Sequence, residues 1–198
     1  MKIQKIKNAI STYWHRFSLK HKGVHVGCNS RFCGSIVFRF SNPANVSIGK
    51  NVIITGGCNI NPLGVRRGSH IKTDFNAYLR IGDYCGFSDV SIVARKGISI
   101  GNYVTIGAGT ILYDSNGHCI NYYERRKEKG VKDRSKLPIT HKPICIEDDV
   151  FIGAYSIITK GVTIGARSII ATGSVVVCDI PSDEVWGGNP AKFIKSLK

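Results

Sequence analysis

Residues 146–176 read IEDDVF-IGAYSI-ITKGVT-IGARSI-IATGSV-V, and this stretch decides the fold. An aliphatic side chain recurs at every sixth position: Ile146, Ile152, Ile158, Ile164, Ile170 and Val176. A period of six is neither the 3.6 of an α-helix nor the 2 of an alternating strand. It predicts a parallel β-solenoid, in which short strands joined by turns each send one side chain into a shared three-sided core.

The same period appears earlier in the chain. The in-phase apolar residues are Ile48, Ile54 and Ile60, then Ile81, Phe87 and Val93, then Ile100, Ile106 and Leu112. Glycine often follows the apolar residue, where it allows a turn with positive φ or a close approach between coils. We therefore expect an all-β prism of about seven coils, each rising about 4.8 Å, with open ends that need caps. An antiparallel β-domain with chance spacing is the alternative, and consecutive hexads in phase argue against it.

Residues 1–22 are organised differently, and we assign them to a separate unit that precedes a β-helix domain at 23–198. Apolar residues recur there at helical spacing, with lysines between them: Ile3, Ile6, Ile10, Tyr13, Trp14 and Phe17. This pattern predicts an amphipathic helix whose apolar stripe is buried somewhere. We expect the helix to cap the open end of the solenoid through that stripe. The alternative is peripheral contact with a membrane surface.

The net charge of +15 is concentrated in residues 1–22, in residues 115–143 and in the tail from Ala191. The prism itself is nearly neutral, and no nucleic-acid recognition motif is present, so we expect no nucleic-acid partner. The basic segments serve solubility alone, or they contact anionic cofactors, anionic glycans or a membrane surface.

The segment MKIQKIKNAISTYW lacks the uninterrupted apolar stretch of a secretory leader, and no run of eighteen apolar residues follows. The seven cysteines form no CxxC pair, and reduced thiols explain their odd number most simply. We therefore expect a cytoplasmic protein, with the inner face of the membrane as an alternative location.

Between Leu112 and Ile144 the hexads stop, and residues 115–143 read SNGHCINYYERRKEKGVKDRSKLPITHKP. A loop this long within a regular scaffold is usually functional or disordered. Asn116 and Gly117 are turn formers that would present His118 at the rim of the prism. Because imidazole exchanges protons near neutral pH, His118 is a candidate general base.

These residues resemble the hexapeptide-repeat, left-handed β-helix acyltransferases, and among them most closely the maltose/galactoside-type and polysaccharide O-acetyltransferases. The resemblance rests on the hexads, on ISIGNYVTIGAGTILYDSNGH at 98–118, on PICIEDDVFIGAYSIITKGVTIGARSII at 143–170, and on GGNPAK at 187–192. It covers the chain from about Val24 onward. The left-handedness is implied by the resemblance alone.

The resemblance implies transfer of an acetyl group from acetyl-CoA, as cosubstrate, to a hydroxyl or an amine. His118 matches the family's catalytic histidine, which deprotonates the acceptor for direct attack on the thioester. Asp89, in GFSDVSIV, matches a residue that orients the acceptor or the imidazole; alternatively it is a solvated turn carboxylate. Cys119 is a weaker candidate, as a thiol nucleophile, because no second histidine–acid pair supports it.

In the family, coenzyme A lies in a groove between two subunits of a homotrimer. By resemblance, Ala154 and Thr172 contact its pantetheine arm, and Lys192 and Lys195 lie near its phosphates. One departure is that Val177-Cys178 stands where many relatives have Thr-Lys before Asp-Ile-Pro.

The long loop suggests a carbohydrate acceptor. Tyr122, Tyr123 and Arg125 would form a platform for a sugar ring, with aromatic faces and a cationic rim. The alternative is a mobile solvated lid.

We therefore expect an acetyl-CoA-dependent O-acetyltransferase that modifies a sugar hydroxyl of a cell-surface polysaccharide or its precursor. The alternatives are a streptogramin-type xenobiotic acetyltransferase and a non-catalytic β-helix scaffold. The six histidines have no zinc-ligand spacing, so we expect no metal.

Overall fold

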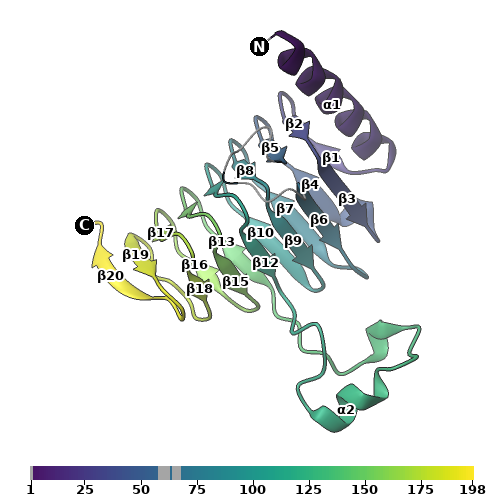
Figure 1. Ribbon diagram of the computed structural model, residues 1–198, viewed down its shortest axis with the longest axis vertical. Coiled ribbons are helices and arrows are strands. Elements are labelled where there is room, and N and C mark those ends of the chain that lie inside the picture. Colours follow the sequence, from purple (N-terminus) through teal and green to yellow (C-terminus); the bar gives the residue numbers. More distant parts are fainter. Residues whose placement is uncertain (1, 58–62, 64–67) are drawn as a thin grey trace.

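The computed structural model describes residues 2–57, 63 and 68–198. In these residues, strands that are parallel except for the last one stack into three sheets that form the sides of a prism (Figure 1). The first sheet runs β1 (His25–Val26), β4 (Val46–Ile48), β7 (Tyr78–Ile81), β10 (Gly97–Ile100), β13 (Ile144–Ile146) and β16 (Thr163–Ile164). The second runs β2 (Arg31–Gly34), β5 (Ile53–Gly56), β8 (Gly86–Ser88), β11 (Thr105–Ile106), β14 (Phe151–Ile152), β17 (Ile169–Ile170), β19 (Glu184–Gly187) and β20 (Lys192–Ser196). The third runs β3 (Ile36–Phe40), β6 (Ser69–Thr73), β9 (Ser91–Ala94), β12 (Ile111–Tyr113), β15 (Ile157–Thr159) and β18 (Val175–Val176).

The predicted left-handed parallel β-helix of hexapeptide repeats is confirmed. The inward side chains of each strand stack on their counterparts in the next coil, and the stacked residues are fully or almost fully buried. In the first sheet the stack is Ile48, Ile81, Ile100, Ile146 and Ile164. Burial of these aliphatic columns is what holds the coils together.

Glycine at the corners permits the close stacking of coils. A Cβ atom on Gly107 would lie 2.5 Å from the backbone nitrogen of Ala154 in the next coil. No real Cβ fits at that distance, so a side chain there would push two coils apart.

Two of the predicted core residues, Val93 and Ile60, are not found in the core of the described structure. Val93 was predicted to face the core, and this is wrong: Ile92 is buried and aligns with Leu112, while Val93 lies on the outer side of β9. The corner after Phe87 contains one residue fewer than a hexad supplies, and Asp89 makes the tighter turn with φ 51°. Ile60 lies outside the described residues, and Ile71 fills the core position next to Ile92.

Helix α1 (Lys2–His21) covers the N-terminal end of the prism (Figure 1). Thr12 Oγ1 accepts from the backbone N–H of Phe32 and donates to its carbonyl, both at 3.1 Å. His15 lies edge-on to Phe32 and Phe38, and Leu19 is buried. The prediction that the apolar stripe makes this contact is wrong, because every residue of the stripe is exposed. The inner face of α1 is mostly polar and bonds to the backbone of the first coil.

The C-terminal end is covered by β19 and β20, which pair antiparallel after the last coil. Trp186 packs against the core, with Phe193 edge-on to it at 6.3 Å between ring centroids. Trp186 is therefore part of the C-terminal cap.

The 115–143 loop leaves the prism after β12 and returns at β13, and Figure 1 shows it projecting to one side with the short helix α2 (Tyr122–Lys127). Short 3₁₀ turns lie at Pro43–Asn45 and, within the loop, at Arg134–Lys136. Its two ends lie together, because Ser115 bridges to His141 and the Lys142 N–H donates to the Asp114 carbonyl at 3.0 Å. The sheet continues across the insertion, since β10 pairs directly with β13.

Candidate active site

The base of the 115–143 loop is fixed by a buried carboxylate. Asp114, at the end of β12, accepts the backbone N–H groups of Arg95, Lys96 and Gly97, each at 2.7 Å. Three such bonds satisfy a carboxylate that no solvent reaches. Asp114 thereby ties the start of the loop to the neighbouring coil. This fixes the backbone four residues before His118.

His118 lies at the rim of the prism and is paired with Glu128. Its Nδ1 atom is 2.6 Å from Glu128 Oε2, and the imidazole is 64% exposed whereas the Glu128 side chain is 5% exposed. An exposed ring held by a buried carboxylate is oriented but still open to a reactant.

Glu128 is held as a carboxylate by its donors. The Cys119 N–H donates to Oε1 at 2.6 Å, and Arg134 donates to Oε2 at 3.2 Å. The bond from the Cys119 N–H and the bond from His118 lower the pKa of Glu128 to about 2. The ionised carboxylate favours the His118 tautomer with the proton on Nδ1, which leaves Nε2 as the basic nitrogen.

Cys119 is buried beside this pair, and its environment does not suit a nucleophile. Burial raises the pKa of its thiol, and the neighbouring Glu128 carboxylate raises it further. A thiol in that state is a poor nucleophile at neutral pH, since the thiolate is the reactive form.

A hollow lies beside the histidine, lined by His118, Arg125, Glu128, Lys129 and Arg134. Arg134 also donates to the Gly117 carbonyl at 3.0 Å, so it fixes the turn that carries the imidazole. Three cations around one carboxylate leave this hollow net positive, which suits an anionic or strongly polar reactant.

The residues of the predicted sugar platform already make contacts within the loop. Tyr122 and Tyr123 are exposed on α2, but the Arg126 guanidinium lies 5.2 Å from the centroid of Tyr122 and the Lys127 ammonium 4.3 Å from that of Tyr123. Arg125 donates to the carbonyls of Cys119 and Ile120 at 3.0 and 2.9 Å. Arg125 therefore shapes the loop, and its role with Tyr122 and Tyr123 in acceptor binding stays a prediction.

The other predicted residues lie along a different edge of the prism. Asp89, Ala154 and Thr172 lie at corners between the second and third sheets, with the Ala108 corner between those of Asp89 and Ala154, whereas His118 follows the third sheet. The backbone stacks there, with the Gly173 N–H donating to the Ala154 carbonyl at 2.8 Å. Lys192 and Lys195 are exposed on β20, at the C-terminal end of the prism.

Asp89 is buried, which excludes a solvated turn carboxylate. Its Oδ1 accepts the Gly57 N–H at 3.0 Å, and its Oδ2 is buried with no partner among the residues that the structure describes. Asp89 does not contact His118 within one chain, so the two are not brought together as a single-chain pair.

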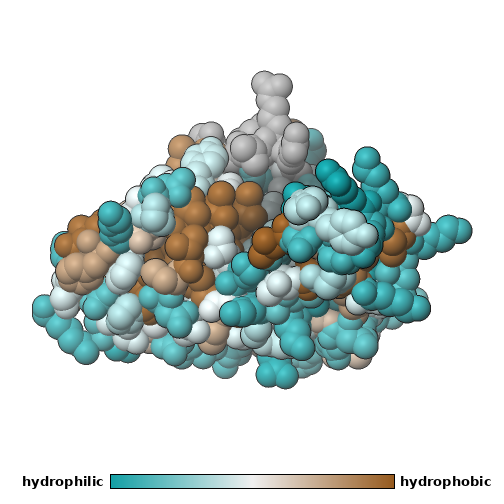
Figure 2. All heavy atoms as spheres, turned by 90° about the horizontal axis from the view of Figure 1, so that it is seen from below, coloured by the Kyte–Doolittle hydropathy of each residue, from teal (hydrophilic) through white to brown (hydrophobic). Residues whose placement is uncertain are grey.

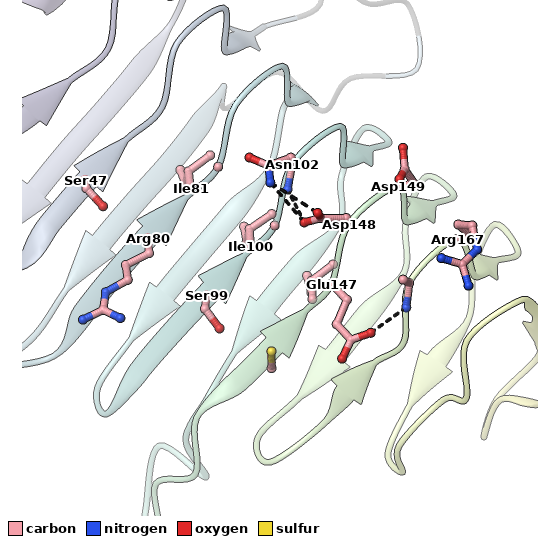
Figure 3. Close-up of a pocket in the computed structure, with 15 residues that line it drawn as sticks. Ser47, Arg80, Ile81, Ser99, Ile100, Asn102, Glu147, Asp148, Asp149 and Arg167 are labelled. Carbon is pink, nitrogen blue, oxygen red and sulfur yellow. Dashed lines mark hydrogen bonds between the residues drawn. The ribbon is translucent and has the colours of Figure 1, made fainter.

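A wider groove on the first sheet is unrelated to this chemistry. Figure 3 shows its labelled residues, among them Asn102 and Asp148 pointing toward one another; the Asn102 N–H donates to Asp148 Oδ1 at 2.7 Å. Glu147 accepts the Ala166 N–H at 2.8 Å. These carboxylates join neighbouring coils at the corner through hydrogen bonds. None of the predicted site residues lines the groove.

Two segments of the chain match models of known repeats. The model described as "Bacterial transferase hexapeptide (six repeats)" matches residues 146–178, and "Hexapeptide repeat of succinyl-transferase" matches residues 78–114. Residues 78–114 and 146–178 are therefore similar to the hexapeptide repeats of transferases. Within the described ranges, no cluster of three or more His, Cys, Asp or Glu side chains is placed to hold a metal ion, and no helix is both long and apolar enough to span a membrane.

Two solved structures are similar to the chain in fold over most of its length. A hexapeptide-repeat-containing acetyltransferase from Vibrio cholerae is 28% identical with a TM-score of 0.60, covering 98% of this chain and 85% of that one. The Vibrio protein has also been solved with acetyl coenzyme A. A variant of AntD, an N-acyltransferase from Bacillus cereus, in complex with dTDP-4-amino-4,6-dideoxyglucose and coenzyme A, has a TM-score of 0.71 at 22% identity, covering 92% and 89% of the two chains.

Two curated N-acetyltransferases are similar to part of the chain. A 2,3,4,5-tetrahydropyridine-2,6-dicarboxylate N-acetyltransferase from Clostridium perfringens is 53% identical over 60 residues, which is 30% of this chain and 25% of that protein. The enzyme of the same name from Staphylococcus aureus is 47% identical over 58 residues, or 29% and 24%. The chain thus spans about a quarter of the length of these relatives.

Proposed function

We propose that the chain is an acetyl-CoA-dependent acyltransferase that transfers an acetyl group to a sugar hydroxyl of a cell-surface polysaccharide or its precursor. The observation that carries this proposal is the His118–Glu128 pair: an exposed imidazole whose Nδ1 is held at 2.6 Å by a buried carboxylate. A general base needs this combination of access, fixed tautomer and fixed orientation.

The chemistry follows from the pair. His118 Nε2 accepts the proton of the acceptor hydroxyl as the hydroxyl oxygen attacks the thioester carbonyl carbon. The C–S bond then breaks, and His118 returns the proton to the departing sulfur. Glu128 stays ionised and stabilises the imidazolium that forms between the two steps. A backbone N–H of a neighbouring coil is the expected donor to the tetrahedral oxyanion.

The edge of the prism between the second and third sheets has properties that suit coenzyme A. Ala154 and Thr172 are small residues at stacked corners, so a long flexible arm has room to lie along them. Lys192 and Lys195 are exposed cations near the end of that edge and suit phosphate groups. Acetyl-CoA bound to the similar Vibrio protein supports this assignment of the donor.

The separation of His118 from Ala154 and Thr172 leads us to propose a homotrimer with the site between copies. A head-to-tail ring of prisms would set the His118 edge of one copy against the Ala154 edge of the next. Apolar residues on the outer face of the third sheet support such packing, since Ile111 and Ile157 align and Ile157 aligns with Val175. Figure 2 shows hydrophobic atoms gathered in patches on the face seen from below.

The acceptor class is supported by the loop rather than by the prism. The cationic hollow and the exposed Tyr122 and Tyr123 suit a large or anionic carbohydrate. The sugar nucleotide bound to AntD makes a sugar amine the second candidate acceptor.

The test is release of free thiol from acetyl-CoA by the full chain in the presence of sugar hydroxyl, sugar amine and streptogramin acceptors. We expect turnover with a sugar hydroxyl, and a loss of about 100-fold or more in His118→Ala while calorimetric titration shows unchanged acetyl-CoA binding. Turnover with only the amine or the streptogramin would reject the proposed acceptor. Binding of acetyl-CoA without turnover, in the parent and in His118→Ala alike, would identify a scaffold.

A further inference from the structure

Helix α1 carries its apolar residues on the face that points away from the protein. The exposed fractions of this α1 stripe are Ile3 71%, Ile6 59%, Ile10 64%, Tyr13 75%, Trp14 64% and Phe17 59%. At 3.6 residues per turn these six side chains fall within about 100° of the helix circumference. Six large apolar side chains in one exposed band are far more than the scattered hydrophobic residues that a protein surface normally carries.

The helix is attached to the prism by its other face, so a rotation that buried the stripe would break existing bonds. Thr12 bonds both backbone groups of Phe32, Arg16 donates to the Ser30 carbonyl at 3.3 Å, and Leu19 is buried. Leu19 and Thr12 lie opposite the stripe on the helical circumference. The outward direction of the stripe is therefore fixed by the contacts of α1 with the first coil.

The end of the prism that carries α1 is strongly basic. Residues 1–73 contain twelve Lys and Arg and no Asp or Glu, and the first acidic residue of the chain is Asp74. On α1, Lys7 and Lys20 are exposed and flank the apolar stripe on its two sides. An apolar band bordered by lysines matches a surface that is hydrophobic inside and negatively charged outside.

We propose that α1 binds the surface of an anionic lipid bilayer, lying in the plane of the interface with its stripe among the acyl chains and its lysines at the headgroups. The lipid is a better occupant than a second copy of the chain, because two N-terminal ends brought together would carry the same charge without an acid between them. Figure 1 shows α1 lying across the end of the prism, so the prism would stand on the bilayer with the 115–143 loop at its side.

The first experiment is flotation of the full chain with vesicles, one set neutral and one containing about 30% anionic lipid. We expect co-flotation with anionic vesicles only, weakened at high salt because the attraction is partly electrostatic. The double variant Ile6→Gln/Ile10→Gln should remain in the soluble fraction. Its matched control is Val177→Gln/Ile194→Gln, which removes two apolar residues of similar exposure at the other end of the prism and should float like the parent.

A second readout follows the helix itself. The chain has two tryptophans, so in a Trp186→Phe background the fluorescence reports Trp14 alone. We expect a blue shift when anionic vesicles are added, because Trp14 leaves water. The stripe variant should keep its acyltransferase rate on a soluble acceptor, so failure of membrane binding and failure of the proposed activity are separate outcomes.

Three results would overturn the proposal: no flotation with anionic vesicles, an unchanged Trp14 spectrum, or equal flotation of the parent and the Ile6→Gln/Ile10→Gln variant. Concentration-dependent association that this variant abolishes, without lipid binding, would assign the stripe to a second copy instead.

Discussion

At the scale of single residues, the proposed site combines an exposed imidazole with a buried carboxylate. In the proposed mechanism His118 must meet a reactant, and Glu128 must remain ionised without competing for that reactant. The chain meets both needs by placing Glu128 beneath the loop, where the Cys119 N–H and Arg134 hold its two oxygens. Its carboxylate then directs the imidazole without reaching the surface.

The first prediction concerns the tautomer of His118. In Glu128→Gln, the amide can present its NH₂ group to Nδ1, which forces the proton onto Nε2 and removes the base. We expect kcat to fall about 100-fold or more while the KM for acetyl-CoA is unchanged, as measured by thiol release. A decrease of less than about threefold would contradict a positioning role, and Glu124→Gln on the exposed side of α2 serves as the control.

The second prediction concerns pH. The pKa of Glu128 is lowered from its ordinary value of 4.5 to about 2, so the carboxylate adds stability that is complete above pH 4.5 and is lost as the pH falls toward 2. The difference in Tm between the parent and Glu128→Gln should therefore be constant above pH 4.5 and shrink below it. A difference that stays constant down to about pH 3 would show that the carboxylate is not held in this way.

The sequence identified His118 but not Glu128. His118 could be predicted because it follows the last regular coil before the loop, where its position depends on a rigid scaffold. Glu128 lies ten residues further, in a segment with no period, and only the folding of the loop over α2 returns it to the imidazole. No spacing rule links the two residues, and the resemblance assigned no role to Glu128.

At the scale of elements, the loop depends on its anchor. The third prediction is that Asp114→Asn destabilises the protein, because an amide NH₂ would face backbone donors that now bond to an oxygen. Leaving a buried N–H unpaired costs about 1–3 kcal/mol. We therefore expect the free energy of unfolding, measured with urea, to decrease by about 3 kcal/mol.

The matched control for the anchor is Asp133→Asn, which changes an exposed side chain of the same loop. Asp133 accepts the Ser135 N–H at the start of a short turn, a role that asparagine fills equally well. Its unfolding free energy should change by less than about 0.5 kcal/mol. Equal effects of the two substitutions would refute the anchoring role of Asp114.

The elements also explain which parts of the fold the sequence could predict. Hexads such as Ile146 to Val176 predict their own coils, because each inward side chain must stack on the one before it. The slip from Val93 to Ile92 escaped prediction because both residues are aliphatic and a corner shortened by one residue leaves no mark in the pattern. The direction of α1 escaped it because the helix is held by hydrogen bonds to backbone carbonyls, which a hydrophobic pattern does not record.

At the scale of the whole molecule, the fourth prediction tests a site shared between copies. His118→Ala removes the base from one edge of the prism, and Ala154→Trp fills the proposed coenzyme groove on another. Each variant alone should be inactive. Coexpressed in equal amounts, they should form mixed trimers in which about a quarter of the interfaces pair an intact His118 with an intact Ala154.

Thiol release by the coexpressed mixture is the measurement, with separately purified variants mixed after folding as the control. About a quarter of the parental rate is the expected result. If the coexpressed variants form trimers but release no thiol, His118 and Ala154 act within one chain. The proposal of a site between copies would then be wrong.

The proposed trimer also bears on membrane binding. Closed threefold symmetry about an axis along the prisms would bring three α1 helices to the same end of the assembly. Three weak contacts on one plane act together, so the assembly would hold a bilayer far more strongly than one chain does.

The continuous pairing of β10 with β13 has an evolutionary consequence. Ile98 aligns with Ile144 as directly as it aligns with Leu79, so the scaffold closes behind the 115–143 loop as if nothing had been inserted. Natural selection can therefore lengthen, shorten or exchange this loop without changing the pairing of the coils. A lineage built on such a scaffold can acquire new acceptors by changing one peripheral segment, while the coils beneath it are inherited unchanged.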